Sequence, residues 1–211
     1  MAAAARKNML LLVILVALLA AAGTLVQRWR AAQPEARAAA VPRQSGIVLA
    51  DLAARHGSAQ ARILLVLPAT APGASLRDWL QIQRSTLEKE IPGGMKIIGT
   101  EPVAGGRGSH TPFTVTSLAT LAQKYPAANL IISLAGAPAP DAATKLPTLL
   151  CFAPEGEHVA ALMQSGQLAA AIVPRNQRVP IEAADGAWYD VLYQVVTSAS
   201  LAAWQSGNTR P

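Results

Sequence analysis

The chain has 211 residues, of which 52% are hydrophobic and only 14% are charged, and its formal net charge is +6 at pH 7. The positive excess lies at the start, because residues 1–43 hold six Lys and Arg against Glu35 alone, whereas residues 44–211 hold twelve against eleven Asp and Glu. This nearly neutral, aromatic-poor body argues against stacking platforms for single-stranded nucleic acid, and one cysteine, Cys151, excludes an intramolecular disulfide and a cysteine metal cluster.

An apolar segment near the N-terminus predicts a membrane-spanning helix. Met9 to Val26 contains no charged residue, and as a helix it would be about 27 Å long against a hydrocarbon core of about 30 Å. We therefore predict a short basic tail at 1–8 and a signal-anchor helix at 9–27. A cleaved secretory signal is the main alternative, since a basic start, an apolar run and three alanines at 20–22 also fit that pattern. A buried helix of a soluble protein is a further alternative.

The segment after this helix predicts a tether. Residues 28–46 mix Ala, Pro, Gln and Arg without apolar periodicity, which is typical of a linker. The arginines here slightly favour a cytoplasmic domain by the positive-inside rule. We nevertheless expect export, because the basic residues before the first apolar segment resemble a signal-anchor. The expected location is the inner (cytoplasmic) membrane with the domain on the periplasmic side, and the lipid bilayer is then the first partner.

Residues 47–204 predict a single domain in which strands and helices alternate. Short apolar runs predict five buried strands, at Arg62–Leu67, Met95–Gly99, Asn129–Ala135, Pro147–Phe152 and Gln167–Val173. Helical spacing predicts helices at 47–56, 76–91 with Ser75 as its N-cap, 114–125, 155–164 with Gly166 as its cap, and 186–204. Residues 205–211 are expected to be a flexible tail.

This alternation indicates an α/β fold. We predict a three-layer sandwich with a five-stranded parallel sheet, strand order 2-1-3-4-5, and helices on both faces.

Residues 62–173 resemble the flavodoxin-like folds and one lobe of a type I periplasmic substrate-binding protein. The resemblance rests on LATLAQKYPAANLIISLAG followed by KLPTLLCF, which is similar to the helix, strand, loop and strand that approach the ligand in such lobes. It implies a fold that binds a small molecule between two lobes. Because only one lobe is present, the resemblance favours a docking module over a complete receptor.

Motifs for catalysis and cofactors are missing from the sequence. The third predicted strand ends in Leu134, Ala135 and Gly136, not in the Asp of a receiver domain, and the two prolines of residues 68–73 do not suit a flavin phosphate loop. There is no nucleotide-binding glycine motif and no G-x-S-x-G elbow, and the three histidines lack metal-ligand spacing. We predict no enzyme activity, no cofactor and no metal.

Loops at the carboxyl ends of the strands are the candidate ligand site, since open α/β sheets bind ligands there. The predicted residues are Thr70, Ser75, Glu101, Arg107, Ser109, His110 and Arg175. The loop around Arg107 combines glycines with a cation, a hydroxyl and an imidazole, which suits an anionic ligand. A plain surface loop is the alternative. Glu155, Glu157 and His158 lie at the start of a predicted helix, where the acidic side chains are expected to complement the helix dipole.

Aromatic residues gather in the last predicted helix. Trp188, Tyr189 and Tyr193 are candidates for a protein interface, and packing of this helix onto the sheet is the alternative. The anchor, the tether, the single lobe and the missing catalytic motifs together predict first a membrane-anchored, non-catalytic docking or accessory subunit of a membrane-associated protein assembly. The alternatives are a small-molecule-binding lobe and, third, an uncharacterised hydrolase or transferase. No nucleic-acid partner is expected.

Overall fold

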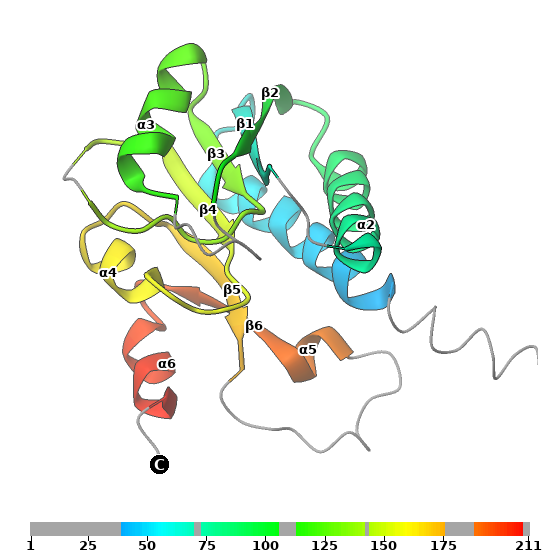
Figure 1. The fold of residues 1–211 in the computed structure, drawn as a ribbon, viewed down its shortest axis with the longest axis vertical. Helices are drawn as coiled ribbons and strands as arrows, with labels where there is room; N and C mark the ends of the chain where they lie inside the picture. The colour runs from blue at the N-terminus through cyan, green and yellow to red at the C-terminus, as the bar shows by residue number, and fades with distance from the viewer. Residues whose placement is uncertain (1–38, 70–72, 106–112, 142–143, 176–187, 209–211) are drawn as a thin grey trace, which may run out of the picture. The chain divides into compact units, whose positions relative to one another are not determined.

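A six-stranded sheet of order β2-β1-β3-β4-β5-β6 organises the domain (Figure 1). The computed structural model describes residues 39–69, 73–105, 113–141, 144–175 and 188–208. The strands are β1 Arg62–Pro68, β2 Lys96–Val103, β3 Leu130–Ser133, β4 Thr148–Phe152, β5 Ala170–Pro174 and β6 Tyr193–Thr197. The first five are parallel, and β6 pairs antiparallel with β5. The predicted α/β class and the order of the first five strands are confirmed.

Helices cover both faces of this sheet. They are α2 Ala74–Glu90, α3 Val115–Lys124, α4 Val159–Gln164, α5 Trp188–Leu192 and α6 Leu201–Asn208, and an earlier helix occupies residues 39–56. The helix at 39–56 and α2 pack on one face, while α3, α4 and α6 pack on the other (Figure 1). Eight of the residues predicted as linker, 39–46, are therefore helical.

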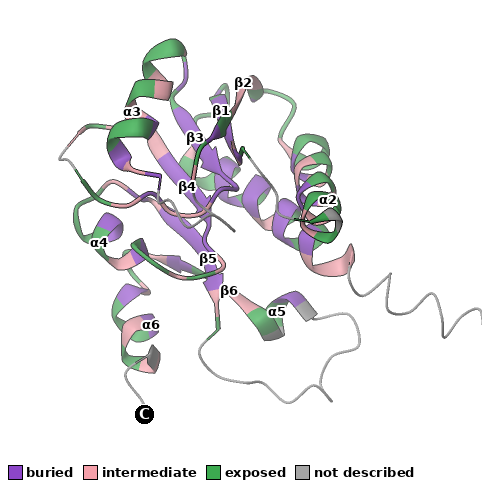
Figure 2. Ribbon diagram, viewed as in Figure 1, coloured by how far each residue is buried: buried purple, intermediate pink, exposed green. Residues whose placement is uncertain are grey.

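The core lies on the two faces of the central strands. β1, β3 and β4 are buried along almost their whole length, as Figure 2 shows, because helices exclude water from both sides of a parallel sheet. Alternate residues belong to opposite faces: Ile63 and Leu65 contact the face of α2, while Leu64 and Val66 contact the face of α3. The short apolar runs in the sequence thus form the centre of the sheet.

The last part of the chain corrects a prediction. The single helix predicted at 186–204 is wrong, because α5 gives way to β6 at Tyr193 and α6 follows only from Leu201. The sheet therefore has six strands and not the predicted five, and the sixth strand is antiparallel. The run Val195-Val196-Thr197 is β-branched, which favours an extended backbone over a helix.

Helix starts also differ from the predictions. Gly73, with φ 85°, and not Ser75, is the N-cap of α2, and Ser75 lies exposed within the first turn. His158, with φ 62°, is the N-cap of α4 and makes no capping bond through its side chain. Glu155 and Glu157 are exposed in the turn before that helix, which has no acidic residue in its first turn. The predicted dipole role of these residues is therefore not what the structure shows.

None of the helices within the described ranges has both the length and the apolar composition that crossing a bilayer requires. The predicted span at 9–27 lies outside those ranges.

Candidate functional site

The carboxyl edge of the sheet brings together the ends of four neighbouring parallel strands. Pro68, Ser133, Phe152 and Pro174 end β1, β3, β4 and β5, and Tyr193 begins the antiparallel β6 beside them. Ligands of open α/β sheets bind in the crevice outside this edge.

The structure describes three of the seven predicted ligand residues. Ser75 is exposed near the start of α2, which follows β1, and Arg175 is exposed directly after β5. Glu101 lies in β2 at the outer edge of the sheet and is partly buried. The other four, Thr70, Arg107, Ser109 and His110, lie outside the described residues.

Glu101 is engaged in holding β2 to the end of α3. The Tyr125 hydroxyl donates a hydrogen bond of 2.7 Å to Glu101 Oε1, and Lys124 Nζ lies 3.8 Å from Glu101 Oε2. The ring of Tyr125 packs against the backbone of Gly99, where an added Cβ would overlap it. The hydrogen bond to Glu101 raises the pKa of Tyr125, so the hydroxyl keeps its proton and remains a donor. These contacts give Glu101 a structural role.

Arg175 is a cation that the β5–β6 pair holds at the carboxyl edge. Its backbone N–H donates to the Leu192 carbonyl at 2.8 Å, and its side-chain Nε donates to the Tyr193 carbonyl at 3.1 Å. Pro174 lies opposite Tyr193 in the register, so the missing N–H of this proline leaves the ladder intact. The side chain is thus oriented by the strand pair while remaining exposed to solvent. This arrangement suits a polar or anionic ligand group.

A row of four aromatic rings lies on the α2 face, below this edge. Ring centroids are 5.0 Å apart for Trp79 and Phe152, 5.2 Å for Phe152 and Tyr193, and 5.9 Å for Tyr189 and Tyr193. Phe152 is 0% and Tyr189 is 6% exposed. Of the three predicted interface residues, Tyr189 is therefore buried and Tyr193 is partly buried against the core. The side chain of the third, Trp188, is not described.

Tyr189 combines burial with a hydroxyl that has no hydrogen-bond partner among the described residues. Desolvation raises the pKa of this phenol, and the nearby charge of Arg175 opposes the shift. The sequence could not reveal this burial, because it follows from the break between α5 and β6.

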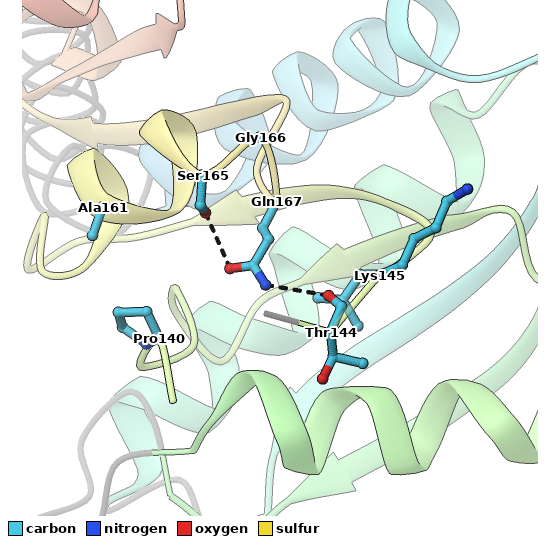
Figure 3. A pocket seen from close by; sticks show the side chains of 8 residues that line it. Pro140, Thr144, Lys145, Ala161, Ser165, Gly166 and Gln167 are labelled. Carbon is cyan, nitrogen blue, oxygen red and sulfur yellow. Dashed lines mark hydrogen bonds between the residues drawn. The ribbon is translucent and has the colours of Figure 1, made fainter. Parts of the chain in front are cut away.

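A surface hollow of about 540 Å³ lies away from this edge, beside α4. Residues from the connections before β4 and β5 line it, and Figure 3 shows Gln167 at its centre. Gln167 Nε2 donates to the Thr144 carbonyl at 3.2 Å, and Ser165 Oγ donates to Gln167 Oε1 at 3.1 Å. The described part of the β3–β4 connection contains no helix, and this hollow adjoins that connection. Its central amide is already hydrogen-bonded.

Groups that could support catalysis are buried or dispersed. Cys151 is fully buried, and desolvation raises the pKa of its thiol, which disfavours the nucleophilic thiolate. Ser133 is also buried and donates its hydroxyl hydrogen to the Gly136 carbonyl at 2.7 Å. Within the described ranges no three His, Cys, Asp or Glu side chains gather in a way that could hold a metal ion.

Comparison with known proteins shows the fold but no family. Neither a family model nor a curated protein sequence matches the chain. Among solved structures, an ABC transporter solute-binding protein from Burkholderia graminis C4D1M in complex with D-arabinose has 16% identity and a TM-score of 0.52, with 77% of this chain covering 61% of that protein. The arabinose-binding protein AraP from Geobacillus stearothermophilus has 12% identity and a TM-score of 0.52, with 77% and 63% covered.

A third structure of the same kind supports this likeness. The sugar-binding protein of a sugar ABC transporter from Bacillus halodurans has 13% identity and a TM-score of 0.51, with 77% of this chain covering 64% of that protein. This chain thus spans less than two thirds of each of these three proteins. The resemblance to a periplasmic substrate-binding lobe is confirmed at the level of the fold. The three matched structures are described as solute- or sugar-binding proteins.

Proposed function

We propose that this domain binds a small polar solute, such as a sugar, at the carboxyl edge of its sheet. The fold is that of sugar-binding proteins from ABC transporters, and open α/β sheets bind ligands at this edge. The observation that carries the proposal is the placement of Arg175. This guanidinium is held by the Tyr193 carbonyl at 3.1 Å yet remains exposed at the edge, so it can donate hydrogen bonds to a ligand.

Solute binding has more support than docking onto an assembly. The docking hypothesis rested on the anchor, the tether, the single lobe and the missing catalytic motifs, and its candidate interface included Tyr189, which is 6% exposed, and Tyr193, which packs against Phe152. The buried ring of Tyr189 and the partly buried ring of Tyr193 contribute to the core of the domain, which leaves less aromatic surface for a partner. The cation at the strand edge, by contrast, remains available to a ligand.

The proposal includes a place in the cell. The uncharged segment at 9–27 has the length of a membrane helix, and the basic residues on both sides of it suit lipid headgroups. We propose that it anchors the domain to the inner membrane, with the domain on the periplasmic side. A binding lobe fixed there would meet solutes before they cross the membrane.

Loss of the Arg175 side chain should weaken solute binding. A charge-assisted hydrogen bond contributes about 1.5–3 kcal/mol, so R175A should raise the Kd of a bound sugar by about 10-fold or more. Binding is measured by isothermal titration calorimetry of the full-length protein in mild detergent, with D-arabinose, other aldopentoses and aldohexoses.

The matched control is R62A. Arg62 is also exposed but begins β1 at the opposite, amino edge of the sheet, so its loss should leave the Kd unchanged. An equal loss of affinity in both variants would show that the carboxyl edge is not the site. Failure of every sugar in the series to bind would contradict the proposed ligand class.

Charges within the apolar segment should release the protein from membranes. Leu11, Leu12 and Ile14 lie in the uncharged run, and a charge in a membrane helix is unfavourable by about 2.5–3.5 kcal/mol at the centre and by less towards the ends. Replacing all three by lysine should move the protein from the carbonate-washed membrane fraction to the soluble fraction. Serine at the same positions is the control, and continued membrane retention of the lysine variant would rule out this anchor.

A further inference from the structure

Three cations at the amino edge of the sheet have no counter-charge among the described residues. Arg62 and Lys96 begin β1 and β2 and are partners in the register of these strands, and Lys145 lies three residues before β4. All three side chains are exposed, and within the described ranges none of them belongs to an ion pair. Like charges on neighbouring strands repel each other, so the sheet itself gains nothing from this arrangement.

The acidic side chains in the same part of the domain neutralise other cations. Each of them is paired with a neighbour on its own helix: Asp51 with Arg55 at 2.8 Å, Glu88 with Arg84 at 2.7 Å and Glu90 with Lys89 at 3.8 Å. The positive charge of the amino edge therefore remains uncompensated.

The carboxyl edge carries an excess of the opposite charge among the described residues. Five exposed acidic side chains lie in the first turns of helices or in the connections at this end of the strands: Asp78, Asp141, Glu155, Glu157 and Asp190. The exposed cations described at this end are Arg43, Arg77 and Arg175. Residues 44–211 are nearly neutral in total, so the charge of the domain is separated between its two ends and is hidden in the sum.

The chain before the domain is long enough for either end to face a membrane. The helix at 39–56 ends at the amino edge, where Gly57 lies beside Leu130, the first residue of β3. This helix therefore begins near the carboxyl edge, about 27 Å away. The eleven residues 28–38 reach about 36–40 Å when fully extended. A segment of that length can pass along the domain, so the amino edge can face the bilayer although the helix begins at the other end.

We propose that the amino edge of the sheet lies against anionic lipid headgroups of the bilayer that holds the anchor. Each Lys or Arg near an anionic surface improves attachment about 5-fold, and the acidic carboxyl edge is repelled by the same surface. Arg175 would then face the solution from which solutes arrive. This inference rests on the anchor that the proposed function includes, but it does not depend on sugar binding. Three free cations are few for nucleic acid, where about 6–10 phosphate contacts are common.

Cysteine labelling of the full-length protein in lipid nanodiscs tests this orientation. Q60C places a thiol in the exposed turn before β1 at the amino edge, and S75C places one near the start of α2 at the carboxyl edge. The native Cys151 is fully buried and does not interfere. An uncharged polyethylene-glycol maleimide should label Q60C at least about 5-fold more slowly in discs that contain phosphatidylglycerol than in discs of phosphatidylcholine alone. S75C should be labelled at the same rate in both.

Charge variants identify the groups that are responsible. R62Q/K96Q removes two of the three cations and should restore most of the labelling of Q60C in anionic discs. R43Q/R77Q is the matched control, because it removes two exposed cations at the other end of the domain, and Q60C should stay protected in it. High salt should act like R62Q/K96Q, since the Debye length falls from about 10 Å at 0.1 M to about 3 Å at 1 M.

Equal labelling of Q60C in the two kinds of disc would overturn the proposal. So would protection of S75C in place of Q60C, or protection of Q60C that survives R62Q/K96Q. Duplex DNA that protects Q60C in neutral discs as strongly as anionic lipid does would identify a nucleic-acid surface, which also overturns the proposal. Loss of the protein from neutral discs would contradict the anchor and with it this inference, whereas retention without protection contradicts the orientation alone.

Discussion

Replacing Phe152 by alanine should lower the free energy of unfolding by about 3–5 kcal/mol. Phe152 is 0% exposed and ends β4, where its ring contacts Trp79 of α2 and Tyr193 of β6 at centroid distances of 5.0 and 5.2 Å. Alanine would remove both ring contacts and leave a cavity between three elements. Urea denaturation followed by circular dichroism on the full-length protein measures the change.

Two other variants separate the aromatic contacts from simple burial. F152L keeps most of the apolar volume, so it should lose only about 1–2 kcal/mol, the part that belongs to the two ring pairs. I47A truncates a side chain that is 37% exposed and should change stability by about 0.5 kcal/mol. If F152A lost no more than I47A, Phe152 would not be part of the core that the structure shows. Because Tyr193 also holds Arg175, F152A should weaken solute binding as well.

The central strands could be predicted from the sequence because they are buried on both faces. Runs such as Arg62–Leu67 and Asn129–Ala135 have no polar face, and with helices between them they leave few arrangements other than a parallel sheet. The observed β1 extends one residue beyond the first run, and the observed β3 lies inside the second run. The strand order followed from the rule for open α/β sheets.

The end of the chain could not be assigned from periodicity alone. Trp188, Leu192, Val195 and Val196 fit one side of a helix, and the same segment also contains a β-branched strand. What decides between them is the edge of β5, since Val173 and Ala171 supply backbone partners for Gln194 and Val196. A sequence pattern contains no information on which edge is free, so tertiary pairing overrides the local preference.

The sequence predicted which loops lie at the carboxyl edge but not the contacts of the residues in them. The rule that ligands bind at the strand carboxyl ends identified Arg175, which the structure places there. The same rule selected Glu101, whose partner Tyr125 is 24 residues away and could not be inferred from spacing. Whether a polar side chain binds a ligand or another side chain depends on such distant contacts.

Replacing Gly46 by alanine should lower the free energy of unfolding by about 2 kcal/mol, although alanine is the better helix former. Gly46 lies where the helix at 39–56 touches α2: an added Cβ would be 2.7 Å from the Gln83 carbonyl oxygen and 2.9 Å from Thr86 Cβ. The α2 backbone cannot rotate away as a side chain would. The helices must therefore separate, which strains the 2.9 Å hydrogen bond from Gln83 Nε2 to Ser45 Oγ.

The sign of the change in unfolding free energy shows whether helix propensity or the contact with α2 dominates. Helix propensity alone predicts that G46A is more stable by about 1 kcal/mol, whereas the contact with α2 predicts a loss. G93A is the control, because nothing lies within 4 Å of a Cβ at Gly93, and urea denaturation of both variants gives the difference.

The result also bears on the linker predicted at 28–46. Small residues such as Ser45 and Gly46 are typical of linkers, but two helices in close contact require the same residues, and only the buried partner Gln83 distinguishes these cases. A stabilising G46A would mean that this helix does not pack closely on α2, and that residues 39–46 behave as the predicted linker after all.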